Sequence, residues 1–160
     1  MSTKPLIMGE SSNKVINMPL GASEVFKDLA GHFVIPDGSG RVQLANATDV
    51  NVIGWALQGE RTSSATEGAD FADVDTDLGK IWEIPAVLND GTAPTDAQLK
   101  AAVGETCDIK IVSTNYQYAN INASSIDIIQ ILAWKRYNNS VGGQTVFVRI
   151  NIEKIVNTGV

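Results

Sequence analysis

The chain has 160 residues, of which 44% are hydrophobic and 19% charged, proportions typical of a folded globular protein rather than a disordered one. Its formal net charge is −6, and a negative surface repels nucleic-acid phosphates and anionic membranes, so neither is an expected partner. The sequence shows no secretion signal and no apolar run of about 20 residues, so we expect a chain made in the cytoplasm that does not span a membrane.

The first 24 residues are predicted to form an extended N-terminal arm. Two short apolar clusters, at 5–8 and 15–18, flank a polar run, and Pro19 and Gly21 interrupt any regular element. A frayed terminus is one interpretation. The other is an arm that docks on a partner as an added strand. The predicted contact residues of this arm are Pro5, Leu6, Ile7, Met8, Val15 and Ile16.

Residues 31–57 are predicted to form a strand, a tight turn and two further strands. The turn at 36–40 combines proline, aspartate and glycine, which suit tight-turn geometry. Val42 and Leu44 alternate with polar residues, as in a half-buried strand. Gly54 interrupts the third strand, which predicts a bulge or a close approach of another backbone.

Residues 58–79 are long, polar and acidic, and we expect a surface loop there, with at most a short strand near Phe71. Strand character resumes at 81–87. Thr95 and Gln98 have the spacing of a capping box, which predicts a short helix that begins at Thr95 and ends at Gly104. Leu99, Ala102 and Val103 are expected to form its buried face.

The last third of the chain returns to strand patterns. Strands are predicted at 107–112, 116–121, 126–134 and 146–153, the last with the most regular alternation. The sequence therefore predicts a mainly β fold, an antiparallel β-barrel or sandwich with one short helix. We divide it into the arm, residues 1–24, and a single β-domain, residues 25–160.

Residues with catalytic chemistry are few. His32 is the only histidine and has no nucleophile motif beside it, so we expect a surface or rim side chain. Cys107 is the only cysteine and is expected in the core. Asp127 and Glu153 could pair as glycosidase carboxylates only if folding brought them together. We therefore predict that the protein is not an enzyme and uses no cofactor.

Two patterns in the sequence suggest binding sites, but neither fits one well. Asp73, Asp75 and Asp77 alternate as in calcium loops, but the glycine and glutamate that follow are out of register with an EF-hand, so no metal site is predicted. Trp55 and Trp82, together with Trp134, could form a sugar-stacking platform, but their apolar context favours core or interface positions.

The pattern of hydrophobic residues and turns resembles capsid decoration proteins, also called cement or head-stabilisation proteins, of tailed bacteriophages. The resemblance spans roughly residues 23–155, and the segments that carry it are 31–34, 37–40, 41–45, 52–56, 103–109, 127–132 and 146–150. It implies a β-tulip or barrel domain that binds the outer surface of the virion capsid, contacts the major capsid protein and forms homotrimers on the shell. Relatives often have a shorter connection where this chain has residues 58–79.

Other functions stay open at this point. A tail or baseplate component would also be rich in strands and oligomeric. A carbohydrate-binding β-module would use the tryptophans, and a hydrolase is the weakest option because reactive side chains are so few.

Overall fold

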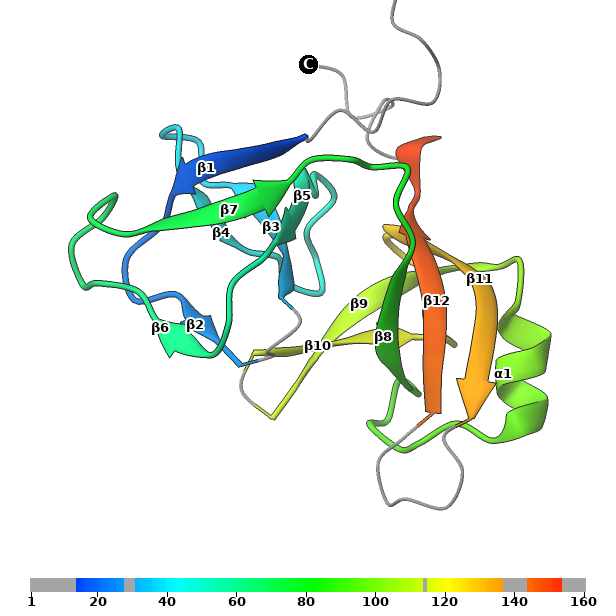
Figure 1. The fold of residues 1–160 in the computed structure, drawn as a ribbon. Coiled ribbons are helices and arrows are strands. Elements are labelled where there is room, and N and C mark those ends of the chain that lie inside the picture. Colours follow the sequence, from blue (N-terminus) through cyan, green and yellow to red (C-terminus); the bar gives the residue numbers. More distant parts are fainter. Residues whose placement is uncertain (1–13, 28–30, 114, 137–143, 154–160) are drawn as a thin grey trace, which may run out of the picture.

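The computed structural model describes residues 14–27, 31–113, 115–136 and 144–153, which form two β assemblies joined side by side (Figure 1). The mainly β class predicted from the sequence is confirmed. The elements, in chain order, are β1 (Val15–Pro19), β2 (Val25–Phe26), β3 (His32–Pro36), β4 (Val42–Leu44), β5 (Gly54–Ala56), β6 (Arg61–Thr62), β7 (Phe71–Asp75), β8 (Trp82–Val87), α1 (Asp96–Ala102), β9 (Thr106–Val112), β10 (Tyr116–Asn120), β11 (Ile129–Arg136) and β12 (Gln144–Ile150).

The N-terminal assembly is a five-stranded sheet in the order β1-β7-β5-β3-β4. All its pairings are antiparallel. The stretch 31–57 supplies β3, β4 and β5 as expected. Gly54 is required where β5 meets β7, because a Cβ atom there would lie 2.4 Å from the carbonyl oxygen of Asp75. The predicted close approach of another backbone is therefore confirmed.

The acidic segment 58–79 differs in part from its prediction. The short strand expected near Phe71 is present as β7, but β7 lies between β1 and β5 in the sheet instead of on a surface loop, and the segment also contains β6. Ala72 and Val74 are buried, whereas Phe71 and Asp73 are exposed. This is the alternation of a strand with one face in a core. Ala72 and Val74 are small and lie among aspartates, so the hydrophobic alternation of this segment is weak. Pairing with the neighbouring strands β1 and β5, more than the local sequence, therefore determines its strand conformation.

The C-terminal assembly is a barrel whose strand pairings run β10-β8-β12-β11-β9 and return to β10. Two of its joins are short: β10 pairs with β8, and β11 with β9, over two residue pairs each. The β10–β8 join is parallel, and the other pairings of the barrel are antiparallel. The strands predicted in the last third of the chain appear as β9 to β12, and the apolar run at 126–134 becomes β11 after a turn at Asp127.

One hydrophobic core lies between the two assemblies. Phe33 and Trp55 on one face of the N-terminal sheet pack with the barrel interior, and their rings meet at right angles with centroids 4.7 Å apart. Trp82 on β8 stacks against Trp55 at 6.0 Å. A second, smaller cluster covers the opposite face of the sheet and includes Phe26 and Val74. The N-terminal sheet is therefore buried on both faces near its centre.

The helix α1 confirms the predicted capping box. The Thr95 hydroxyl accepts the backbone N–H of Gln98 at 3.3 Å, and the Gln98 side-chain oxygen accepts the N–H of Thr95 at 2.8 Å. The helix ends at Ala102, and Gly104, which follows the C-cap residue Val103, has a φ of +93°, the left-handed conformation common just after helix C-termini. Leu99 and Ala102 are buried, but Val103 is 41% exposed, so its predicted place on the buried face is wrong. Its backbone has already left the helix there.

Candidate functional site

The predicted contact residues of the arm fall into two groups. Pro5, Leu6, Ile7 and Met8 lie outside the residues that the structure describes. Val15 and Ile16 lie on β1, the outermost strand of the N-terminal sheet, next to β7 (Figure 1). Val15 is 37% exposed and Ile16 is 50% exposed. The last part of the predicted arm is thus a strand of the sheet, and it presents large apolar side chains at the sheet's edge.

Polar contacts fix β1 against β7 along its length. The Asn17 amide donates to the Asp73 carboxylate at 2.8 Å, directly across the pair. At the start of the strand, the Lys14 ammonium donates to Asp77 at 3.1 Å. This hydrogen bond, helped by the N–H of Gly79, lowers the pKa of the Asp77 carboxyl. Both contacts hold the edge strand in place and leave its apolar side chains on the surface.

His32 does not lie at the surface or rim, as the sequence suggested. Its side chain is fully buried. Its Nε2 accepts the backbone N–H of Lys27 at 3.2 Å, and its ring contacts the edge of Phe26 with centroids 5.5 Å apart. A ring nitrogen that accepts a backbone hydrogen bond is committed to the fold, so this geometry indicates a structural histidine. Sequence reasoning did not indicate this burial, because Phe26, whose ring contacts His32, lies on the two-residue strand β2, which has no periodic pattern.

Cys107 lies in the core, as predicted. Burial, together with the nearby carboxylates of Asp108 and Asp127, raises the pKa of its thiol to about 12. The side chain is therefore a neutral thiol at physiological pH and lacks the thiolate character that nucleophilic catalysis needs.

The alternating aspartates of the acidic segment take separate roles. Asp73 accepts from Asn17, Asp75 is buried and paired with Lys80, and Asp77 caps the following turn. Among the described residues, no three histidine, cysteine, aspartate or glutamate side chains are grouped so that they could hold a metal ion. The carboxylates thus act as hydrogen-bond and ion-pair partners within the sheet.

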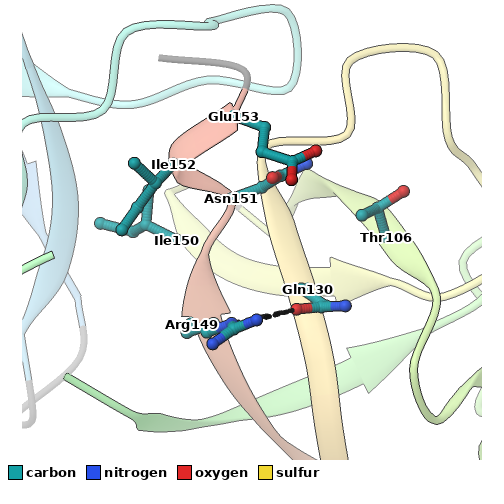
Figure 2. Close-up of a pocket in the computed structure, with 7 residues that line it drawn as sticks. All are labelled: Thr106, Gln130, Arg149, Ile150, Asn151, Ile152 and Glu153. Atoms are coloured by element: carbon teal, nitrogen blue, oxygen red, sulfur yellow. Dashed lines mark hydrogen bonds between the residues drawn. The ribbon is translucent and has the colours of Figure 1, made fainter. Parts of the chain in front are cut away.

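A polar hollow of about 310 Å³ lies at one end of the barrel (Figure 2). It is lined by Thr106, Gln130, Arg149, Ile150, Asn151, Ile152 and Glu153. The Arg149 guanidinium is turned toward Gln130 and donates to its side-chain oxygen at 2.7 and 3.0 Å (Figure 2). Glu153 is the one carboxylate in the lining. Asp127 lies outside it and accepts from the Thr106 hydroxyl at 2.7 Å. The hollow therefore lacks the paired carboxylates of a glycosidase.

The tryptophans do not form a sugar-stacking surface. Trp55 is 6% exposed and packs edge-on against Phe33 and face-on against Trp82. Trp134 is half-buried and packs against the same core. An aromatic platform for a sugar needs an exposed ring face, and the faces of Trp55 and Trp82 are turned to each other.

Two buried polar side chains organise the fold, and sequence reasoning missed both. Asp108 accepts the N–H groups of Ser125, Ile126 and Asp127 and also the Ser125 hydroxyl. Gln117 on β10 donates to the carbonyls of Phe33 and Ala45 and accepts the N–H of Phe33 at 2.7 Å. Because their partners lie 17 to 84 residues away, no local pattern could indicate them.

No helix within the described ranges is long and apolar enough to cross a membrane. Comparison with protein-family models, with curated proteins and with solved structures gave no match in any of the three. The functional argument therefore depends on this chain's own residues and geometry.

Proposed function

We propose that the protein is a structural virion protein that binds the outside of an icosahedral capsid. It stabilises the shell by bridging neighbouring major capsid subunits. The observation that carries this proposal is the edge strand β1, which presents Val15 and Ile16 at the surface, with the polar run 9–14 between it and the apolar segment 5–8. A strand edge with exposed apolar side chains is an adhesive surface, since it offers backbone hydrogen bonds together with hydrophobic contacts.

The remainder of the described structure suits a bridging role. The two assemblies share one core, and Gln117 ties β10 to β3 through two hydrogen bonds with Phe33 and makes a third to the carbonyl of Ala45. A body joined in this way can transmit force between two attachment points. Each contact on a shell can be weak, because many copies that attach at several points gain stability from avidity.

The chemistry of the described residues also favours adhesion over turnover. The histidine is buried and bonded to backbone, and the cysteine is a neutral core thiol. These features leave the capsid decoration role, suggested by the sequence resemblance, as the function that the geometry supports best. A tail or baseplate position would use the same surfaces, and imaging of particles distinguishes the two sites.

The test is a truncation that spares the sheet. Removing residues 1–13 deletes the apolar segment 5–8 but keeps β1 and its pairing with β7. We expect the shortened chain to fold, as measured by circular dichroism, and to lose most of its binding to empty shells in a co-sedimentation assay. Leu57→Ala, which trims an exposed apolar side chain away from β1, is the matched control and should bind normally. Undiminished binding of the truncated chain would refute the role of the arm.

A further inference from the structure

The backbone of β1 has two sides with different roles. Thr76 donates its N–H to the carbonyl of Lys14 at 2.9 Å, and Leu20 donates its N–H to Asp70 at 2.8 Å. In an antiparallel pair, alternate residues face the partner strand, so positions 14, 16, 18 and 20 face β7. The N–H and C=O groups of Val15 and Asn17 therefore point to the outer edge. Pro19 agrees with this register, because the nitrogen it lacks as a donor also points outward.

At Leu20 the chain forms a parallel bridge with Val42 of β4, but within the described ranges no strand pairs with the outer edge of Val15–Asn17. We propose that a second copy of the chain does so, with the two β1 strands antiparallel about a twofold axis at Ile16. In this register Val15 of one copy lies opposite Asn17 of the other, and both residues have outward-pointing groups. Each such pair exchanges two hydrogen bonds, so the twofold gives four. The two Ile16 side chains then face each other in the close, non-hydrogen-bonded pair.

The exposure and the charge of β1 favour a second copy of the chain as its partner and Ile16 as the centre of the pair. The exposed part of β1 is its first three residues, whereas Met18 and Pro19 are half-buried. Residues 15–19 carry no charge in a chain of net charge −6, so the edge is a place where two copies approach with little repulsion. Lys14 would lie opposite the partner's Met18, and the two Lys14 side chains would sit at opposite ends of the pair.

Pairing three residues per strand buries far less than the roughly 1,200 Å² of a stable protein interface. The free protein should therefore associate weakly and reversibly. Sedimentation equilibrium of the full chain should show an average mass that rises with concentration from 17.1 kDa toward twice that value. The inference concerns the free chain and does not depend on the proposed capsid role, because no shell is present in the measurement.

Two substitutions at the predicted centre test the register. Ile16→Lys and Ile16→Glu each place like charges face to face, so each chain alone should stay monomeric. An equal mixture of the two should associate again, because unlike charges then meet across the axis. Leu57→Lys is the matched control, since Leu57 is 52% exposed and lies away from the edge, and it should associate like the unaltered chain.

Circular dichroism would first establish that both Ile16 variants fold, which their half-exposed position favours. If either variant does not fold, Val15→Pro replaces it. That change removes an outward N–H and leaves the ladder to β7 intact, and it should also give a monomer. A wild-type chain that stays monomeric at millimolar concentration would overturn the inference. So would a trimer, or any association that Ile16→Lys leaves unchanged.

Discussion

At the scale of single residues, the described structure depends on a few buried polar side chains with many partners. The Asp108 carboxylate is 5% exposed and accepts four hydrogen bonds from the turn at 125–127. Burial by itself would raise its pKa, but the donors from Asp127, Ile126 and Ser125 outweigh burial and lower it. The charged form is therefore the one that holds this turn against β9.

Asp108→Asn should lower the free energy of unfolding at pH 7 by about 2 kcal/mol, because hydrogen bonds to a charged acceptor are worth more than those to a neutral one. The folded-state pKa is below the ordinary value of 3.8, so the contribution is present above pH 3.8 and is lost as the pH falls through the folded-state pKa. Urea unfolding at pH 7 and at pH 3 should thus show a smaller difference between wild type and variant at pH 3. Glu105→Gln removes the same charge from an exposed side chain and should have little effect at either pH. An equal loss at both pH values would contradict a charged Asp108.

At the scale of secondary-structure elements, local chemistry determined what the sequence could predict. The strand–turn–strand unit at 31–57 and the capped helix were predictable, because turn residues, period-two alternation and a capping box act within a few positions. The edge position of Val15 and Ile16 was predictable only in part: their apolar character was visible, but their pairing with β7 was not. That pairing depends on a strand 58 to 60 residues away.

The elements that sequence reasoning missed depend on tertiary contacts. The sequence predicts only a short strand near Phe71 within a surface loop, because aspartates occupy three of the positions 73–77, whereas β7 is an inner strand of its sheet and Ala72 and Val74 form its buried face. His32 was placed at the surface because its cover comes from Phe26 on a two-residue strand that has no periodic signal. In both cases a distant or very short element decides the burial.

The capping box makes a prediction for α1. Thr95→Ala removes the hydroxyl that accepts the Gln98 N–H, and we expect a loss of about 1 kcal/mol in the free energy of unfolding. Because Leu99 and Ala102 pack the helix onto the barrel core, the loss should appear in global unfolding rather than only in helix fraying. Thr95→Ser keeps the hydroxyl and should retain nearly full stability. Thermal unfolding of the wild type and both variants measures the difference. Equal stability of the Ala and Ser variants would show that the cap contributes nothing.

At the scale of the whole molecule, two assemblies act as one body. The core that contains Phe33, Trp55 and Trp82 belongs to both, and Gln117 adds a polar tie between β10 and β3. β1 and β4 are the two end strands in the pairing order of the N-terminal sheet, and a parallel bridge between Leu20 and Val42 brings the end of β1 next to β4, while Val15 and Ile16 stay exposed. This arrangement leaves an adhesive edge on a well-anchored body, which is what a protein that bridges capsid subunits requires.

The most direct measurement is electron cryo-microscopy of shells of the major capsid protein, assembled with and without this chain. The account predicts additional density on the outer surface, at regular lattice positions between neighbouring subunits, with β1 and the segment before it at the contact. Shells that show no such density at saturating chain concentration would contradict the proposed function.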